Sequence, residues 1–388
     1  MTKKVLIVAL AKDWTGISRL PSGLSRAGFE VVALCPAGSY LSKTKYLSQV
    51  MTYPTFTYTR SKLVYGWILA AMMRFKADIV VPGDEDALLA LQSLANSLSK
   101  IPGFSSYAKQ LRRFMAPAEF DQVVLNKSRF VEHCREWGVR VPKNTRVESL
   151  EMALREVPSF GYPVVLKFDF GYGASGVTIC HSENDLRKGF AKHSTAGFST
   201  KLKSAIKRML FVVQEADQAG ISLQQYITGQ VGLVPFVANQ GQVFAINPMV
   251  KVKTYPGETG PSSVVKGIDN AEIRNAVTTA AAKLNYSGFG ALDFIIDQKT
   301  QDAYVIEMNP RPVPSSHFGG DMCAEDLCVS LFAALNDQGP KAAPSFKPFL
   351  VALFPNEKRR DSKSPYLTEA YHDVPVEDAE LLAALDRQ

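Results

Sequence analysis

The chain has 388 residues and a mass of 42.6 kDa, which is enough for two or three domains of ordinary size. Apolar residues make up 46% and charged residues 21%, a globular balance that excludes disorder, collagen and low-complexity repeats as the main description. The 44 Lys and Arg outnumber the 37 Asp and Glu by seven, a mild basic excess that suits an anionic small ligand as well as a nucleic acid.

Cysteine usage and apolar runs indicate the cellular compartment. The five cysteines are Cys35, Cys134, Cys180, Cys323 and Cys328. They are scattered and form no CxxC pair, which argues against a zinc site or a disulfide framework and favours reduced thiols. The run at residues 5–10 is shorter than a signal peptide needs, and the one at residues 64–73 is too short to cross a bilayer and favours a buried helix. We therefore expect a cytoplasmic protein without a membrane partner.

The first third of the chain alternates short apolar strands with helices. Strands are expected at residues 4–9, 30–35 and 77–81, and helices at residues 19–27 and 84–94. This alternation predicts a parallel sheet covered on both faces, which we assign to an α/β, Rossmann-like domain of residues 1–116. No GxGxxG motif follows the first strand, so a dinucleotide site is not indicated.

Two acids follow the third of these strands. Ligands of open parallel sheets bind beyond the carboxyl ends of the strands, which makes Asp84 and Glu85 candidates for a binding pocket. The alternative is that these acids cap the helix that begins there, and the sequence favours neither reading.

A second unit is expected at residues 117–338, followed by a C-terminal extension at residues 339–388. The second unit is predicted to contain helices at 126–137 and 271–284, a strand at 164–168, strands within 223–250 and a hairpin at 291–308. The extension is rich in Pro, Lys and acids, which predicts irregular packing. Residues 186–208 hold seven basic residues and no acid, but their two aromatic residues are too few to interleave with the basic ones for base stacking. We expect a solvated helical insertion there and no nucleic-acid partner.

The strongest chemical signal is the last hairpin. Folding its two runs about the polar turn places Asp297 opposite Ala303. The same register places Asp293 opposite Glu307, and opposite residues of an antiparallel pair share one face. Two carboxylates on one buried face repel each other unless a cation lies between them.

Two further residues complete this set. Asn309 lies two residues past Glu307 and returns to the same face, where its amide adds a neutral oxygen. Such oxygens suit Mg²⁺ that bridges phosphates, whereas a soft metal would want other ligands. Arg311 adds a fixed positive charge nearby. The alternative is an exposed hairpin whose acids face water, and the complete Asp…Glu-x-Asn-x-Arg set argues against it.

The order of these motifs resembles the ATP-grasp superfamily, whose members are mostly carboxylate–amine ligases. The resemblance covers roughly residues 115–335 and is carried by Glu307-Met-Asn309-Pro-Arg311, by the strand Pro-Val-Val-Leu-Lys at 163–167 and by the glycine-rich residues 171–176. It implies an N-terminal pre-ATP-grasp domain followed by a two-lobed α+β ATP-grasp fold. The flexible lobe would span about residues 158–228.

The resemblance also implies ATP as a substrate and assigns residues to it. Lys127 and Lys167 match the two lysines that neutralise phosphate charge, and a buried Lys167 without a partner would be costly. The glycine-rich run resembles the flap over the triphosphate, with Gly173, Ser175 and Gly176 donating to phosphate oxygens. The alternatives are that Lys127 is a surface lysine on a helix and that the glycine-rich run is a plain turn.

A hinge between the two lobes is expected where the chain reads Leu-Gln-Gln-Tyr-Ile-x-Gly from residue 223. Backbone groups of Gln225 and Ile227 would contact the adenine edge. Most relatives have acids at the positions of Gln224 and Gln230, where ribose hydroxyls are held. An amide still accepts from a hydroxyl, so both glutamines stay candidates.

Substrate contacts are expected in three places. The loop around residues 251–263 resembles the substrate-facing loop of amino-acid ligases in this superfamily. The candidates for substrate binding are Lys251, Ser262, Ser263, His317 and Glu85, with Lys253 and Arg311 as catalytic residues. A surface loop and a structural histidine are the respective alternatives for residues 251–263 and for His317.

The resemblance implies a ligase that forms an amide-type C–N bond through an acyl phosphate, with an amino acid as one substrate. Two Mg²⁺ ions would be held by Asp293, Glu307 and Asn309, and Mn²⁺ is an expected substitute. The alternatives are a kinase that stops at the phosphorylated product and a nucleotide-binding regulatory protein without turnover. Partners would be a small carboxylate or equivalent oxygen nucleophile and an amine. Relatives are often homodimers, although no stretch of the sequence marks an interface.

Overall fold

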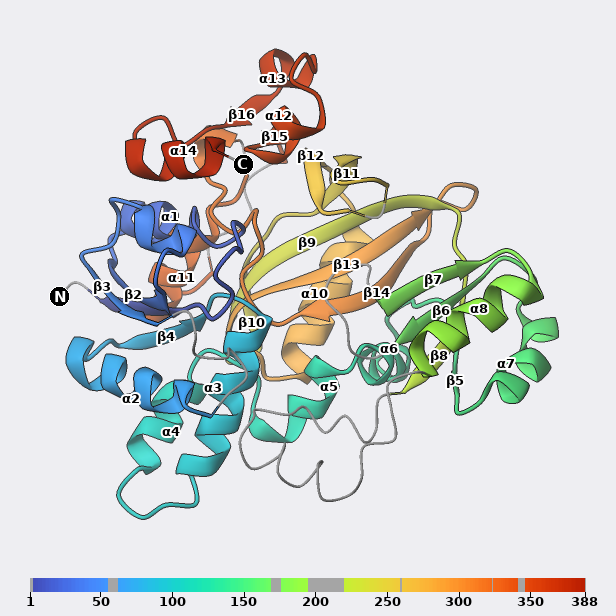
Figure 1. Cartoon of the computed structure of the whole chain (residues 1–388), viewed down its shortest axis with the longest axis horizontal. Coiled ribbons are helices and arrows are strands. Elements are labelled where there is room, and N and C mark those ends of the chain that lie inside the picture. The colour runs from blue at the N-terminus through green and yellow to red at the C-terminus, as the bar shows by residue number, and fades with distance from the viewer. Residues whose placement is uncertain are drawn as a thin grey trace.

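The computed structural model describes residues 3–54, 62–168, 176–194, 220–258, 260–322, 324–340 and 346–387. Three sheets make up its framework. They are a four-stranded sheet ordered β3-β2-β1-β4, an eight-stranded sheet ordered β14-β13-β9-β11-β12-β15-β16 with β10 on β9, and a four-stranded sheet ordered β5-β8-β6-β7. Figure 1 shows the first sheet and the third on opposite sides of the large one.

The N-terminal sheet is parallel, as the alternation of strands and helices predicts. Its strands are β1 (Lys4–Val8), β2 (Glu30–Pro36), β3 (Gln49–Tyr53) and β4 (Ile79–Pro82). Its helices are α1 (Leu20–Arg26), α2 (Val64–Phe75), α3 (Glu85–Leu98) and α4 (Ser105–Arg112). Alternate residues of the buried strands face opposite sides of the sheet, so both sides are packed with apolar side chains.

One face of this sheet is covered by a helix from far along the chain. Helix α11 (Leu327–Leu335) contributes Leu327 and Leu331 to the cluster that contains Val5 and Ile7 of β1. Because a shared apolar cluster must be broken to separate the two units, the N-terminal sheet and the large sheet pack as one body at this seam.

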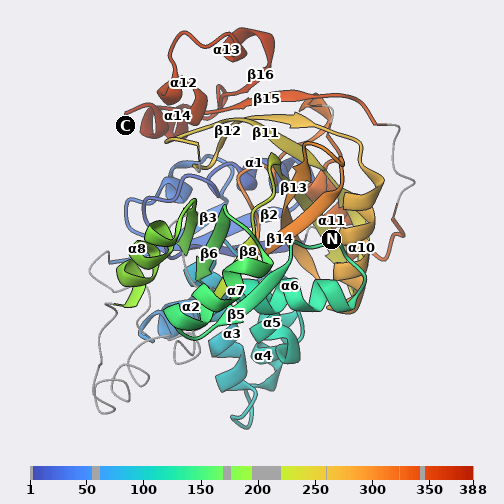
Figure 2. The ribbon, with the colours of Figure 1, turned by 90° about the vertical axis from the view of Figure 1, so that its right-hand side faces the viewer.

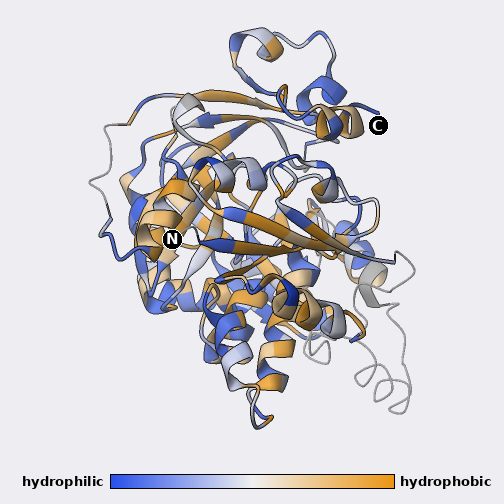
Figure 3. Ribbon diagram, turned by 90° about the vertical axis from the view of Figure 1, so that its left-hand side faces the viewer, coloured by the Kyte–Doolittle hydropathy of each residue, from blue (hydrophilic) through white to orange (hydrophobic). Residues whose placement is uncertain are grey.

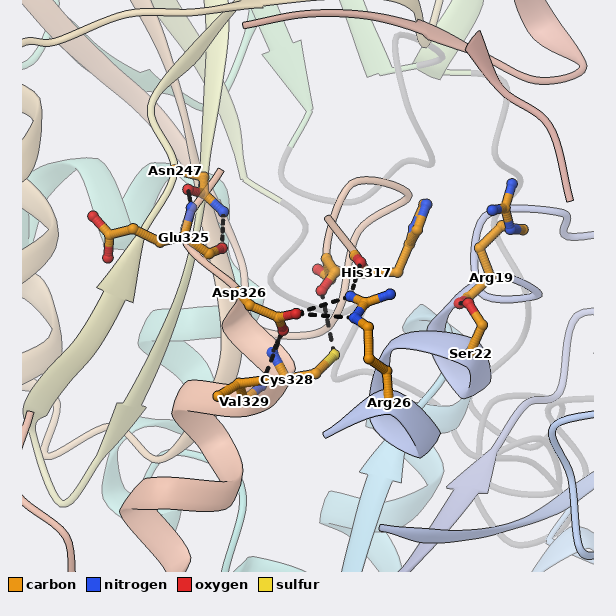
Figure 4. Close-up of polar contacts among 10 residues, drawn as sticks. Arg19, Ser22, Arg26, Asn247, His317, Glu325, Asp326, Cys328 and Val329 are labelled. Carbon is orange, nitrogen blue, oxygen red and sulfur yellow. Dashed lines mark hydrogen bonds and ion pairs between the residues drawn. The ribbon is translucent and has the colours of Figure 1, made fainter. Parts of the chain in front are cut away.

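Polar contacts reinforce the same seam (Figure 4). Arg26 of α1 donates to the Asp326 carboxylate at 2.9 Å and to the carbonyl oxygen of His317 at 3.0 Å. Asp326 also caps α11, because its other oxygen accepts from the backbone N–H groups of Cys328 and Val329 at 3.0 Å. The start of α11 is therefore fixed to α1.

The small third sheet forms a lobe of its own. It contains β5 (Asn144–Val147), β6 (Val164–Phe168), β7 (Val177–Cys180) and β8 (Ile221–Gln225), covered by α7 (Leu150–Glu156) and α8 (Glu183–Ser194). The β6 bounds match the predicted strand. Helix α8 confirms the helical start of the basic segment, whose residues 195–208 lie outside the described residues, as do Gly173 and Ser175.

The large antiparallel sheet carries the predicted hairpin. Its strands are β9 (Gly229–Asn239), β10 (Gln242–Ile246), β11 (Met249–Thr254), β12 (Ser262–Gly267), β13 (Gly288–Asp297) and β14 (Ala303–Asn309). Helices α5 (Asp121–Leu125), α6 (Lys127–Glu136) and α10 (Ala271–Lys283) pack against it. Figure 2 shows its strands twisting between the helices below and the C-terminal segment above.

The prediction that the C-terminal extension packs irregularly is wrong. Strand β15 (Leu350–Leu353) joins the large sheet antiparallel to β12, and β16 (Tyr371–Asp373) pairs with β15 in parallel. Helices α12 (Asn356–Arg360), α13 (Tyr366–Glu369) and α14 (Ala379–Asp386) complete the segment. The sequence hides these strands because each is four residues or fewer and is supported by its neighbour.

Helix α2 covers the predicted apolar run but is buried on one side only. Val64, Ile68 and Met72 are buried, whereas 61% of Met73 is exposed. Figure 3 shows such mixtures of hydrophobic and hydrophilic residues along several helices. Among the described residues, no helix is both long and apolar enough to cross a membrane. The cysteines at 35, 134, 180 and 328 are buried free thiols, and Cys323 lies outside the described residues.

We expect Glu357→Ala to destabilise the protein. The fully buried Glu357 carboxylate accepts from Ser263 Oγ at 2.7 Å and from Arg360 Nε at 2.8 Å, and truncation leaves these donors without their acceptor. The expected loss is about 2–4 kcal/mol in the free energy of unfolding, measured by urea denaturation. The control is Asp386→Ala, which breaks the exposed pair with Lys358 and should cost at most about 0.5 kcal/mol. Equal losses in both variants would contradict the prediction.

Candidate functional site: a carboxylate pair between two sheets

The predicted pairing of Asp293 with Glu307 is confirmed. The two residues are partners across β13 and β14. Asn309 Nδ2 donates to Asp293 Oδ1 at 3.3 Å, and an Arg311 guanidinium nitrogen lies 3.5 Å from Asn309 Oδ1. The four residues that the sequence groups as a metal set therefore lie together at one end of the hairpin.

The predicted pairing of Asp297 with Ala303 is wrong, because a bulge changes the register. Ile296 is the partner of Ala303, and the register shifts by one residue at Ile306. Asp297 instead closes the turn by accepting from the backbone N–H groups of residues 299 and 300, which lowers its pKa. Ile306 is the extra residue of the bulge, and its carbonyl oxygen accepts from Lys167 Nζ at 3.1 Å.

Two lysines from different elements converge on the carboxylate pair. Lys127 begins α6, where Asn126 caps the helix by accepting from the N–H of Arg129 at 2.9 Å. The Lys127 ammonium lies 2.8 Å from Glu307 Oε2, and the Lys127 and Glu307 side chains are each 17% exposed. Lys167 of β6 is buried and reaches the same strand from the small lobe. Both lysines named from the sequence thus face the hairpin.

The two acids after β4 have different roles. Asp84 caps α3 by accepting from the N–H of Ala87 at 2.8 Å, and its second oxygen accepts from Leu10 and Ala11 N–H groups at 2.7 and 2.9 Å. Glu85 instead lies 3.6 Å from the Arg311 guanidinium. Capping is therefore the role of Asp84, while Glu85 extends the site across to the N-terminal sheet.

Burial and mutual repulsion set the charge state of the pair. Burial, followed by repulsion from Glu307, raises the pKa of Asp293 to about 7. Burial would also raise the pKa of Glu307, but attraction by Lys127 and Lys167 outweighs it and lowers the pKa. The pKa of Glu85 is raised by burial, against attraction by Arg311 and Lys127. A site with these tendencies favours an added cation.

The donor set fits Mg²⁺. Among the described residues, no group of three or more His, Cys, Asp or Glu side chains could hold a metal by itself, so a metal here depends on the amide oxygen of Asn309 beside the two carboxylates. Carboxylate and amide oxygens are hard ligands, and a carboxyl group with a pKa raised by its neighbour gains from a cation between them.

Two of the four hinge residues, Gln224 and Gln225, lie on β8, the strand beside Lys167, while Ile227 follows β8 and Gln230 lies on β9. Gln224 is buried and pairs with Val165, so its side chain shares a sheet face with Lys167 two residues further on. The N–H of Gln225 is occupied, because it donates to the Lys143 carbonyl oxygen at 2.8 Å. Ile227 is buried, whereas Gln230 is exposed and pairs with Ile296.

The substrate candidates divide into those near the pair and those elsewhere. Attraction by Lys251 offsets part of the raised pKa of Asp293, which places it near the pair. Lys253, two residues on, is exposed. Ser262 is half-buried, and its carbonyl oxygen accepts from Asn356 Nδ2 at 3.2 Å. Gly176, the flap residue within the described part, is buried at the start of β7.

The prediction that Ser263 and His317 contact substrate is wrong. Ser263 is fully buried and donates to Glu357, and His317 is 3% exposed with its Nε2 2.9 Å from Asp373 Oδ2. Both partners come from the C-terminal segment, so the sequence around either residue could not reveal them. The helix-capping Asn126 and the Ile306 bulge were also missed. An Asn at the first position of a predicted helix is the one available signal.

A family model described as an ATP-grasp domain matches residues 124–315, the range that contains the carboxylate pair and both lysines. A carbamoyl-phosphate synthase of Methanobrevibacter smithii is 26% identical over 168 residues, which are 43% of this chain and 41% of that protein. The chain thus spans about two fifths of that relative's length.

Solved structures share the fold. The biotin carboxylase domain dimer of Hydrogenobacter thermophilus 2-oxoglutarate carboxylase, in complex with MgADP, ADP and bicarbonate, has a TM-score of 0.63 at 19% identity, over 90% of this chain and 74% of that one. An L-amino acid ligase from Bacillus licheniformis has a TM-score of 0.61 at 17% identity, over 89% of this chain and 78% of that one. At these identities the likeness establishes the fold.

Asp293→Asn should flatten the pH dependence of stability in the metal-free protein. The folded pKa of about 7 lies above the unfolded value of 3.8, so this carboxyl group destabilises the fold increasingly as pH rises through that interval. An amide cannot ionise and can donate to Glu307. We expect the variant's Tm to fall less than that of the wild type between pH 5 and pH 8, measured by differential scanning fluorimetry.

The second part of this test measures how Mg²⁺ with ATP changes the Tm. Mg²⁺ with ATP should raise the Tm of the wild type at pH 8 and have a much smaller effect on Asp293→Asn. Parallel Tm curves for the two proteins, or equal stabilisation by Mg²⁺ with ATP, would contradict the assignment.

Proposed function

We propose that this chain, whose residues 124–315 form an ATP-grasp domain, is an ATP-dependent ligase that joins a carboxylate to an amine and releases ADP and phosphate. The observation that carries the proposal is the half-buried pair of Asp293 and Glu307 with Lys127 and Lys167 directed at it from two lobes. A negative pair surrounded by cations suits a metal–triphosphate complex, in which both signs of charge are present.

The chain's own residues would bind and orient ATP. Lys127 and Lys167 would neutralise phosphate oxygens, and the glycine-rich segment that ends at Gly176 would close over them. Ile227 would offer its N–H to the adenine edge, and Gln225 its carbonyl oxygen, because its N–H already donates to Lys143. The candidates for the ribose hydroxyls are Gln224 and Gln230.

Magnesium, when bound by Asp293, Glu307 and Asn309, would offset phosphate charge and align the transferring group. Phosphoryl transfer depends chiefly on positioning and electrostatics, and the residues of this site would supply both. Two ions are proposed, with Mn²⁺ as a substitute.

The bond changes follow from this arrangement. A substrate carboxylate oxygen attacks the γ-phosphorus, the bond to the β-phosphate oxygen breaks, and an acyl phosphate and ADP form. The amine then attacks the acyl carbon, loses a proton, and phosphate leaves. Arg311 would stabilise the oxyanion, and Lys251, Lys253 and Ser262 would hold the acyl phosphate or carboxylate. Exclusion of water protects the intermediate from hydrolysis.

An amino acid is the proposed substrate. Arg311 and Glu85 present opposite charges 3.6 Å apart at the edge of the site, and this pairing complements a molecule that carries both a carboxylate and an amine. The shared fold with an L-amino acid ligase supports this substrate class. We also propose a homodimer in the cytoplasm, on the precedent of the biotin carboxylase domain dimer and the reduced buried thiols.

ADP release with Mg-ATP over pooled carboxylates and amines tests the proposal. Release should require both a carboxylate and an amine, and deconvolution of the pools names the substrates. The blank is Lys167→Ala, because loss of this buried cation should abolish phosphate binding. Release with one partner alone would favour a kinase. If no pool gives ADP release while ATP still raises the Tm, the result would favour a regulatory protein.

Glu307→Gln should lower turnover by about a hundredfold or more while leaving the protein folded. The substitution keeps the shape but removes the charge that faces Lys127 and any bound metal. The matched control is Asp297→Asn in the same hairpin, whose exposed side chain serves the turn, and its turnover should stay near that of the wild type. Near-normal turnover in a folded Glu307→Gln protein would refute the metal assignment.

A further inference from the structure

One buried carboxylate of the C-terminal segment contacts two loops that are far apart in the sequence. Asp373 ends β16 and is 2% exposed. Its Oδ1 lies 3.0 Å from an Arg19 guanidinium nitrogen, and its Oδ2 lies 2.9 Å from His317 Nε2. Arg19 also donates to the backbone carbonyl oxygen of Asp373 at 2.6 Å. Figure 4 shows Arg19 and His317 projecting in the same direction from facing segments.

Asp373 is held as a carboxylate in this position. Burial by itself would raise its pKa, but attraction by His317 and Arg19 outweighs burial and lowers the pKa. Its Oδ2 has His317 as a hydrogen-bond partner, whereas Oδ1 has no hydrogen bond among the described residues and depends on the ion pair with Arg19, so the buried carboxylate is stabilised only while both side chains stay in place. The carboxylate therefore fixes the two side chains relative to each other.

Each of these two side chains stands at the end of a loop. Residues 9–19 connect β1 to α1, and residues 310–317 follow β14. They touch directly, since a Cβ built on Gly16 would lie 3.0 Å from Cγ of Pro314. Such a Cβ would also lie 2.5 Å from the Trp14 ring of its own loop, so only glycine fits here.

The same two loops meet again at the site itself. Asp84 accepts from the N–H groups of Leu10 and Ala11 at the start of the first loop. Its neighbour Glu85 lies 3.6 Å from Arg311 at the start of the second. The contacts thus close a ring, with the Glu85–Arg311 pair at one end and Asp373 at the other.

We propose that Asp373 is a positioning residue that holds these two loops together and thereby sets the separation of Glu85 and Arg311. The part that concerns substrate rests on the proposed function, whereas the coupling of the loops does not. Asp373 suits this role because β16 is anchored through β15 to β12 of the large sheet. Arg26 holds the backbone of His317 from another side, so Asp373 governs the side-chain end of the contact.

Amide hydrogen exchange in Asp373→Asn tests the coupling without any substrate or nucleotide. An amide has only one oxygen for two donors, so the ring opens. Exchange should rise about tenfold in both loops, which contain hydrogen-bonded amides at Ser18 and Ser316. The control is Glu369→Gln, an exposed carboxylate of the same segment, which should leave exchange unchanged.

Variants that remove only one of the two side chains bound by Asp373 distinguish positioning from general destabilisation of the fold. Arg19→Gln should raise exchange mainly in residues 9–19, and His317→Gln mainly in residues 310–317. If Asp373→Asn does not fold, these two variants still test whether Asp373 couples the two loops. Faster exchange in neither loop, or an equal rise throughout the chain, would overturn the proposal.

A kinetic measurement links the ring to the reaction. With substrates found by ADP release, Asp373→Asn should lower kcat about tenfold and leave the KM for Mg-ATP within twofold, because the nucleotide lysines lie outside the ring. A rise in the KM for Mg-ATP with unchanged kcat would overturn the positioning role. Failure of the ligase proposal would leave the exchange result standing, so the two outcomes are distinguishable.

Discussion

Two half-buried carboxylates held opposite each other are the constraint around which this structure is organised. Asp293 and Glu307 are partners in the β13–β14 hairpin at one edge of the large sheet, and neither can move away without breaking the β13–β14 pairing. Their repulsion must be offset where they stand. Lys127 does so from the start of a capped helix, and Lys167 does so from the small lobe through the bulged strand.

This constraint explains why several separate units meet at one place. The small lobe supplies Lys167, helix α6 supplies Lys127, and the N-terminal sheet supplies Glu85 opposite Arg311. The N-terminal sheet is brought there by an apolar cluster that it shares with α11 and by the contacts of Arg26. Apolar burial provides most of the energy of this assembly, and the polar contacts fix its register.

The C-terminal segment shows how buried polar contacts can position a site from a distance. Glu357 and Asp373 are buried carboxylates that each accept from donors on other elements. Glu357 binds Ser263 and Asp373 binds His317, two side chains that the sequence suggested for substrate binding. Each contact instead fixes a neighbouring strand or loop. An ordinary polar residue near a motif therefore serves the geometry of the site without touching the reacting groups.

Features that depend on short spacing can be predicted from the amino-acid sequence. The strand bounds of β6, the pairing of Asp293 with Glu307 and the grouping of Asn309 and Arg311 follow from local periodicity within one hairpin or strand. Three features could not be predicted and depend on packing: the bulge at Ile306, the division of roles between Asp84 and Glu85, and the strands of the C-terminal segment. The physical reason is distance along the chain: Arg19 and Asp373 are 354 residues apart, and no local pattern records a contact that only the packed sheets bring about.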